Sequence, residues 1–265
     1  VARGDGMCLF TLSRRPLTFR PGEGLSRLDA EQLLGPDSPP ESDPLPVGLS
    51  TRDLVASCVA SDRGMIRISE VRFALLPASY RSQLTFDTLH LMEKRTAGPG
   101  QAPGARLAPI FMELTREATR AGMFHLVANL YESAPLRDTF GPPPADPHEL
   151  IEQLAAVASA LGWGSLSVVE LTPGERLVLS APLTPEAVYY AARHGGTPQS
   201  RLPGLQGLAE ALALLVSFVK FTGDGLPTDA YAKLARTGPT VRTQETRSIL
   251  SGDRECEVAV ELTPR

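Results

Sequence analysis

Cysteine is scarce in this chain of 265 residues. The three cysteines, Cys8, Cys58 and Cys256, are odd in number and far apart in the sequence. Such a set excludes the dense disulfide framework of small secreted proteins and favours a reducing compartment. We therefore expect a cytoplasmic protein.

Long hydrophobic runs are also absent. A membrane helix needs roughly 18 or more consecutive apolar residues, whereas the most apolar stretch, residues 208–221, is shorter and contains Glu210 and Lys220. Residues 1–10 show no basic region followed by a long apolar stretch, so no secretory signal is visible. We expect no membrane partner.

The chain has no excess of basic residues. Lysine and arginine total 26 against 30 aspartates and glutamates, which gives a net charge of −4 at pH 7. This balance argues against a generally basic nucleic-acid-binding protein. Arg236, Arg242 and Arg247 form a small basic patch that Glu245 offsets, so DNA association through these arginines is kept only as an alternative.

The usual signatures of catalysis and metal binding are missing as well. None of the four histidines lies four residues from another, the spacing of a helical metal site. The glycines of residues 222–225 lack the Lys-Ser/Thr pair of a phosphate loop. Ser165 stands between a helix and a strand in the reverse order of a nucleophile elbow. We expect no catalytic residue, no metal and no cofactor.

Aromatic residues make up only 6% of the chain, and Trp163 is its single tryptophan. Trp163 lies between two glycines at a predicted helix-to-strand corner, and Tyr190 lies on a predicted helix. Together with Phe124 and Phe218, these residues predict an apolar ligand cavity with a phenolic hydrogen-bonding group. The alternative, that all four simply fill the core, stays open.

Proline and glycine, by contrast, are plentiful, at 24 and 23 residues. Residues 35–48 contain five prolines and five acidic or serine residues, a composition typical of a solvated linker. We therefore predict an N-terminal arm and linker over residues 1–49 and one domain over residues 50–265.

Hydrophobic periodicity predicts the elements of the first half. Residues 7–12 are expected to form a strand and residues 51–61 a short helix. Residues 64–73 alternate apolar and polar side chains with one slip in phase, which predicts one strand. Two amphipathic helices follow, at residues 77–94 and 110–132. Their predicted core-facing residues include Leu84, Leu91 and Leu114.

The second half carries clear helix caps and turns. Asp146 and Thr184 each precede a proline and then a carboxylate, which predicts two helix starts. Pro173 and Gly174 separate two strand-like runs, as in a β-hairpin. Because strands come in adjacent pairs and helices in blocks, we predict an α+β fold with an antiparallel sheet and helices packed on one face. The remaining predicted elements are helices at 204–221 and 229–235 and strands at 240–245 and 257–262.

Three segments of the C-terminal part resemble the 4-vinyl reductase domain family. They are ALGWG at residues 160–164 with the strand LSVVEL after it, PEAVYYAARHG at residues 185–195, and ETRSILSGDRECEVAV at residues 245–260. The resemblance covers about residues 105–262. The family's α+β fold agrees with the element order above.

Members of this family include sensor domains of aromatic-responsive transcription activators, proteins linked to bacteriochlorophyll vinyl reduction and relatives of vesicle-tethering TRAPP subunits. The sensor domains dimerise, and several bind zinc through a glutamate and cysteines of the closing segment. Glu245 and Cys256 match those positions, but Ser248 and Leu202 stand where two cysteines are expected. Neither side chain replaces a thiolate, so we expect no zinc.

The resemblance implies a non-catalytic, bacterial-type regulatory or scaffolding protein that forms a homodimer, binds a small apolar ligand and acts through a protein partner. One alternative is an enzyme or accessory protein of tetrapyrrole vinyl reduction, although the sequence has no nicotinamide or flavin fingerprint. The other alternative is the DNA-associated protein considered above.

Overall fold

All residues described in the computed structural model lie in the unit Pro44–Arg265, one of two into which the chain divides. The predicted strand at residues 7–12 and the predicted helix at residues 51–61 lie outside the described residues, and the domain boundary at residue 49 stays a prediction. The structure describes residues 65–68, 71–74, 79–95, 107–132, 142–182, 184–195, 202–222 and 226–265.

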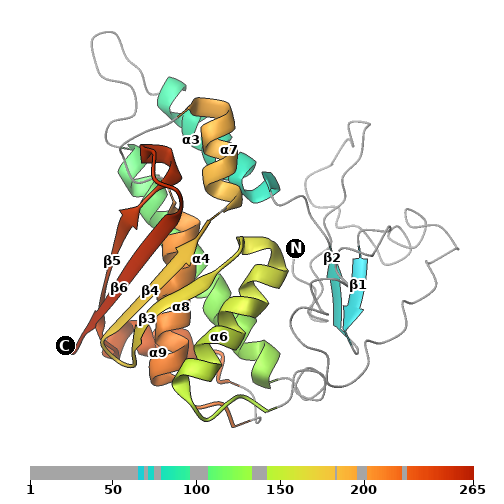
Figure 1. Ribbon diagram of the computed structural model, residues 1–265, viewed down its shortest axis with the longest axis vertical. Coiled ribbons are helices and arrows are strands. Elements are labelled where there is room, and N and C mark those ends of the chain that lie inside the picture. Colours follow the sequence, from blue (N-terminus) through green and yellow to red (C-terminus); the bar gives the residue numbers. More distant parts are fainter. Residues whose placement is uncertain are drawn as a thin grey trace, which may run out of the picture. The chain divides into compact units, whose positions relative to one another are not determined.

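These residues form six α-helices and six strands (Figure 1). A π-helical turn, η1 (Ser159–Trp163), extends α6, and a 3₁₀ turn, η2 (Ile249–Ser251), connects β5 to β6. None of the described helices combines the length and the apolar character needed to cross a membrane. The elements are β1 (Met65–Ile68), β2 (Val71–Ala74), α3 (Ser79–Arg95), α4 (Leu107–Glu132), α6 (Pro147–Ala158), β3 (Ser167–Thr172), β4 (Arg176–Ala181), α7 (Pro185–His194), α8 (Pro203–Phe218), α9 (Ala230–Thr237), β5 (Thr240–Arg247) and β6 (Cys256–Thr263).

The main sheet has the strand order β3-β4-β6-β5, and every neighbouring pair is antiparallel. The hairpins β3–β4 and β5–β6 are joined through the central pair β4–β6. Helix α8 packs against β4, β5 and β6, and α4 packs on α8, so both helices lie behind the sheet in Figure 1. The predicted α+β class with an antiparallel sheet is confirmed.

The single strand predicted at residues 64–73 is wrong. The structure has two short antiparallel strands instead, β1 and β2, with Ile66 paired with Phe73 and Ile68 with Val71. Two residues, Ser69 and Glu70, connect them. The slip in the alternation therefore marks a reversal of the chain, because paired residues of a hairpin share one face of the sheet.

The predicted helix caps are confirmed. Asp146 accepts a hydrogen bond from the backbone nitrogen of His148 at 3.1 Å, and Thr184 accepts one from Ala187 at 3.1 Å. A proline occupies the first turn of each helix, where its missing N–H costs no hydrogen bond. The helical run from α6 ends at Gly162, whose φ of 85° favours glycine.

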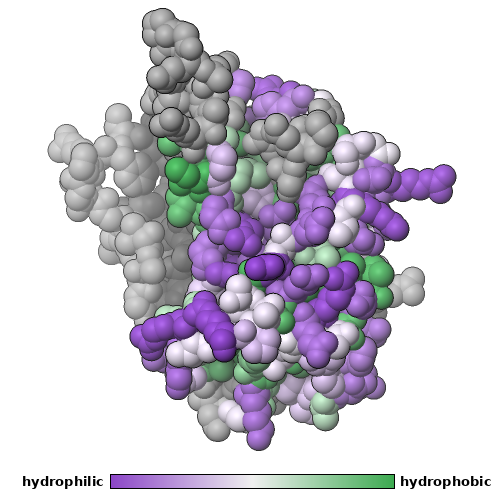
Figure 2. Space-filling view, turned by 90° about the vertical axis from the view of Figure 1, so that its left-hand side faces the viewer, coloured by the Kyte–Doolittle hydropathy of each residue, from purple (hydrophilic) through white to green (hydrophobic). Residues whose placement is uncertain are grey.

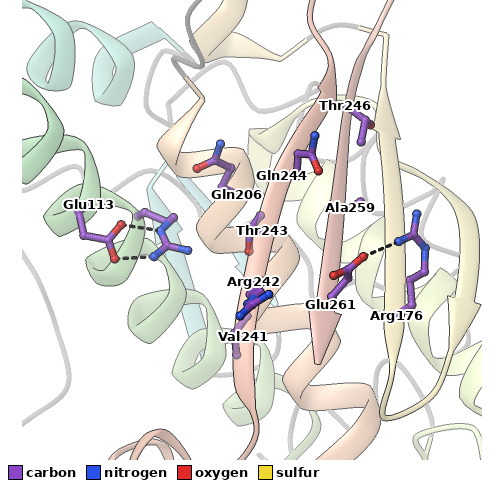
Figure 3. A pocket seen from close by; sticks show the side chains of 11 residues that line it. Glu113, Arg176, Gln206, Val241, Arg242, Thr243, Gln244, Thr246, Ala259 and Glu261 are labelled. Carbon is purple, nitrogen blue, oxygen red and sulfur yellow. Dashed lines mark hydrogen bonds and ion pairs between the residues drawn. The ribbon is translucent and has the colours of Figure 1, made fainter. Parts of the chain in front are cut away.

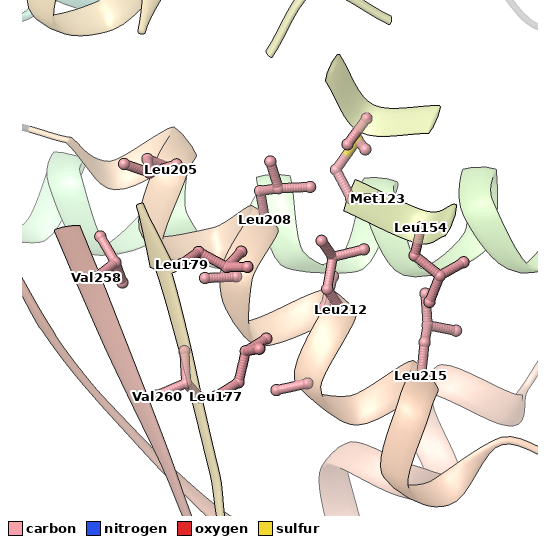
Figure 4. Close-up of a cluster of buried hydrophobic side chains, with 14 of the residues drawn as sticks. Met123, Leu154, Leu177, Leu179, Leu205, Leu208, Leu212, Leu215, Val258 and Val260 are labelled. Carbon is pink, nitrogen blue, oxygen red and sulfur yellow. The ribbon is translucent and has the colours of Figure 1, made fainter. Parts of the chain in front are cut away.

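The core is built around α8, which is buried along most of its length. Its leucines lie between the inner face of the sheet and the helices α4 and α6 (Figure 4). Because α8 is surrounded in this way, it is apolar on nearly every side rather than amphipathic. The labelled members of this core are Met123, Leu154, Leu177, Leu179, Leu205, Leu208, Leu212, Leu215, Val258 and Val260.

The predicted inner faces of α3 and α4 are partly wrong. Leu84, Leu91 and Leu114 are 53%, 55% and 62% exposed. Helix α3 buries Phe86 and Leu89 instead. On α4, Arg116 and Arg120 face α8 because α8 carries the buried Glu210. Hydrophobic spacing alone does not reveal such a partner.

Candidate functional site

Helices α3 and α7 lie side by side and run in the same direction. The rings of His90 and His194 are 5.7 Å apart, and those of Phe86 and Tyr190 are 5.0 Å apart in a T-shaped contact. From the first pair to the second, the contact moves by four residues along each helix, which is about one helical turn. One further turn toward the N-termini, Ser82 therefore lies level with Glu186.

Glu186 is a buried carboxylate in the first turn of α7 and caps a different helix. Its two oxygens accept hydrogen bonds from the backbone nitrogens of Gly204 and Leu205, each at 2.9 Å, at the start of α8. A Cβ atom on Gly204 would lie 2.7 Å from the carboxylate, so the close approach requires glycine. Burial raises the pKa of Glu186, and Arg81 and the two amides oppose that rise.

Arg81 of α3 lies on the ring of Trp163, and its charge interacts with that of Glu186. Its guanidinium carbon lies 3.2 Å from the centre of the Trp163 ring, within range of a cation–π interaction. Burial lowers the pKa of Arg81, and the charge of Glu186 opposes this; an arginine remains protonated in either case. A cation, a carboxylate and a large aromatic face therefore meet under α3.

A kink at Gly162, within η1, places Trp163. The ring is only 9% exposed, and η1 ends at Trp163 between two glycines with positive φ. Ser159 fixes this corner, since its hydroxyl donates to the carbonyl of Ala155 at 2.8 Å and accepts from the backbone nitrogen of Leu166 at 3.0 Å.

Ser82 adds an unusual feature to the same place. The residue is 1% exposed, yet its hydroxyl finds no hydrogen-bond partner within the described part of the chain. Native proteins leave few buried polar atoms unsatisfied, and each exception calls for an explanation. We call Arg81, Ser82, Phe86, Trp163, Glu186 and Tyr190 the α3–α7 seam.

The structure brings two of the four predicted ligand residues to this seam. Trp163 lies under Arg81, and Tyr190 contacts Phe86. Phe124 lies elsewhere, in the core against the ring of Tyr231 at 5.3 Å. Phe218 is 44% exposed at the last residue of α8, about 21 Å along the helix axis from the end that Glu186 caps.

Of the four positions at which the family resemblance implies zinc ligands, Leu202, Ser248 and Cys256 are buried and Glu245 is half-buried. Cys256 and Leu202 are fully buried members of the core. Burial raises the pKa of the Cys256 thiol. Ser248 caps η2, accepting a hydrogen bond from the backbone nitrogen of Leu250. Among the described residues, no three His, Cys, Asp or Glu side chains are grouped to hold a metal ion.

A second buried polar cluster, missed by the sequence analysis, joins α4, α8, α9 and β5. The carboxylate of Glu210 is fully buried and accepts hydrogen bonds from Arg116, Arg120 and Thr243. Arg120 also donates to the hydroxyl of Tyr231 at 2.8 Å. Two features of the sequence could have revealed this cluster. The arginines lie four residues apart on α4, and α8 is an otherwise apolar helix that contains one glutamate.

Trp163→Ala is expected to lower the free energy of unfolding by about 3 kcal/mol, because the ring is buried and its removal leaves a large cavity. Urea unfolding measures the change. Phe218→Ala, which removes a half-exposed ring, is the control and should cost clearly less. Equal costs for the two variants would contradict the burial of Trp163.

Tyr231→Phe tests the second cluster through its pH dependence. Burial, with the hydrogen bond to Glu117, raises the pKa of Tyr231 to about 12, above the value near 10 of an unfolded tyrosine. The native state therefore favours the neutral phenol, and its contribution is complete below about pH 10 and is lost as the pH rises toward about 12. The variant should be about 1 kcal/mol less stable at neutral pH, and this difference should shrink above about pH 10. A difference that does not change with pH would be inconsistent with the raised pKa.

The fold is similar to that of a solved sensory domain. The similar structure is the crystal structure of the phenol-responsive sensory domain of the transcription activator PoxR with phenol, at 14% sequence identity and a TM-score of 0.48. The alignment covers 81% of this chain and 91% of that chain. No family model and no curated protein matches the chain, so membership of the 4-vinyl reductase domain family stays a prediction.

Proposed function

We propose that this protein is a non-catalytic regulatory domain that binds a small ligand at the α3–α7 seam. The ligand class is a molecule with one flat apolar ring and one polar group. The observation that carries the proposal is the buried hydroxyl of Ser82, unsatisfied among the described residues, next in sequence to Arg81, which lies on the Trp163 ring and interacts electrostatically with Glu186. Most ligand sites combine an apolar lining with a few such polar groups.

The packing of α3 supports this proposal. Among the described residues, its buried apolar contacts form a small separate cluster of Phe86, Leu89 and Ala108, and Tyr190 packs against both this cluster and the main core. An element with few buried apolar contacts opens at low free-energy cost. Ligand entry by displacement of α3 is therefore inexpensive, and a displaced helix is a signal that a protein partner can read.

The chemistry of Cys256 favours binding over catalysis. A thiolate is the reactive form of cysteine, but burial raises the pKa of this thiol and keeps it protonated. Its neighbours include Thr184 and the backbone of Ile249, which belong to the packed interior. The residue therefore acts as a small hydrophobic side chain.

The test is a thermal-shift series with four single-ring probes: phenol, benzoate, benzylamine and toluene. Phenol, with a ring and one neutral hydroxyl, is expected to raise the Tm most, since ligands that bind only the native state stabilise it. Toluene should give a smaller shift because it leaves Ser82 unsatisfied. No shift with any of the four probes would contradict the proposal.

Ser82→Ala separates binding from folding. Removing an unpaired buried hydroxyl should leave stability unchanged or slightly higher, but it should reduce the phenol shift to that of toluene. Phe218→Ala is the matched control, because it lies far from the seam and should leave the phenol shift unchanged. Equal phenol shifts for Ser82→Ala and wild type would contradict binding at the seam.

We also infer that the domain forms a homodimer through α4. Leu107, Ile110 and Leu114 are 38%, 56% and 62% exposed, and their spacing of three and four residues places them on one face of the helix. Burial against the same face of a second copy removes this surface from water.

Leu114→Glu should therefore convert the dimer to a monomer in light scattering. Leu126→Glu, on another face of α4 and 38% exposed, should leave the dimer intact. A monomeric wild type, or a dimer that survives Leu114→Glu, would contradict this interface.

A further inference from the structure

An open groove runs along β5. Its volume is about 730 Å³, and β5 lies between its two walls: α4 and α8 on one side and the outer face of the sheet on the other (Figure 3). The lining residues that matter here are Glu113, Arg116, Arg176, Arg242, Gln244 and Glu261. The view onto the β5 side of the molecule is largely hydrophilic (Figure 2).

The backbone of β5 is available for pairing. In the described part of the chain, β5 is the last strand of the sheet and pairs only with β6. Alternate N–H and C=O groups of such an edge strand point away from its partner and can bond another strand. From Thr240 to Glu245 the register has no interruption, so this stretch of the edge is regular.

The two edges of the sheet differ in the length of their regular stretches. Both edge strands have one register shift, a common way to block the pairing of an edge strand: in β3 it lies between Val168 and Glu170, and in β5 between Glu245 and Arg247. Strand β5 contains neither lysine nor proline, and its charged residues are Arg242, Glu245 and Arg247. The longer uninterrupted stretch, residues 240–245 of β5, therefore lies on the edge that faces the groove.

Arg242 gives the groove a charge preference. The other two arginines already have carboxylate partners: Arg116 pairs with Glu113 and Glu210, and Arg176 pairs with Glu170 and Glu261 at 3.1 Å each. Arg242 makes no ion pair with any described residue. Its side chain projects from β5 beside the groove in Figure 3.

We propose that β5 is the docking edge for an extended acidic segment of a partner protein. The segment adds antiparallel or parallel to β5 as a fifth strand, between the edge of the sheet and α4. Main-chain hydrogen bonds supply affinity, and an aspartate or glutamate opposite Arg242 supplies specificity, as in other recognition by strand addition. This site is separate from the ligand seam.

The experiment begins with selection of linear peptides from a random display library on the full chain. The enriched peptides should carry an acidic residue within a β-prone run. Each amide of the best peptide is then methylated in turn. Because only alternate amides of an added strand face β5, methylation should weaken binding at every second position and leave the positions between unchanged.

Arg242→Glu tests the charge preference. Binding of the acidic peptide should fall roughly tenfold, and the same peptide with lysine in place of its acidic residue should bind the variant better than wild type. Arg254→Glu is the matched control, since Arg254 is exposed and outside the groove, and it should leave binding unchanged.

Several results would overturn the proposal. They are a selection that enriches no acidic peptide, a methylation profile without a period of two, and equal effects of Arg242→Glu and Arg254→Glu. Self-association of the chain through β5, seen as a mass change on mutation of this edge, would equally overturn it, because the occupant would then be a second copy.

Discussion

Gly207→Val is expected to lower the free energy of unfolding by about 5 kcal/mol, a large part of the stability of a typical domain. Gly207 lies where α8 meets α4. A Cβ atom there would lie 2.3 Å from the carbonyl oxygen of Arg116 and 2.9 Å from the Cβ of Thr119. Because these are atoms of a packed neighbouring helix, the two helices would have to separate, which costs more than ordinary overpacking.

Gly122→Ala is the matched control, since Gly122 is also helical but a Cβ atom added there would meet nothing within 4 Å. Alanine should stabilise α4 there by up to about 1 kcal/mol, because glycine is a poor helix former. Urea unfolding of both variants is the measurement. A Gly207→Val protein as stable as wild type would show that α4 and α8 are not in close contact.

Glu210→Ala is expected to cost about 4 kcal/mol, the range seen when one partner of a buried ion pair is removed. The carboxylate is fully buried, whereas Arg116 and Arg120 are 20% and 16% exposed. Burial raises the pKa of Glu210, and Thr243 and the two arginines oppose this rise. Removing the carboxylate takes away the buried partner of two guanidinium groups, which then keep only the more exposed carboxylates of Glu113 and Glu117.

Addition of Arg116→Met to Glu210→Ala should recover part of the loss, since an apolar pair avoids the unpaired charge. Glu152→Ala, at an exposed position of α6, is the control and should change stability by less than about 0.5 kcal/mol. A cost of Glu210→Ala as small as that of Glu152→Ala would contradict the buried network.

Local signals predicted the second half of the chain well. Asp146 and Thr184 act as helix caps because capping depends on residues within one turn. The hairpin β3–β4 follows from Pro173 and Gly174 for the same reason. The prediction of one strand in place of β1 and β2 also rested on a local pattern. A chain reversal between two short strands gives the same hydrophobic periodicity as one strand with a slip in phase.

The candidate site could not be predicted in this way, because its contacts join distant segments. Glu186 caps α8 from the first turn of α7, and Arg81 reaches Trp163 across 82 positions of the chain. Local patterns do not specify such pairs. Trp163 and Tyr190 were identified by residue type, whereas Ser82 was not, because an unsatisfied hydroxyl is a property of the packed structure alone.

The most direct test of the central claim uses the emission of Trp163, the only tryptophan of the chain. The protein is titrated with the ring compound that raises the Tm most, and its fluorescence is excited at the red edge of tryptophan absorption. The emission should change to saturation, with the same Kd that calorimetry gives. Ser82→Ala should weaken that Kd, and Phe218→Ala should not change it. Calorimetric binding without any change in the emission of Trp163 would place the ligand elsewhere and contradict the account.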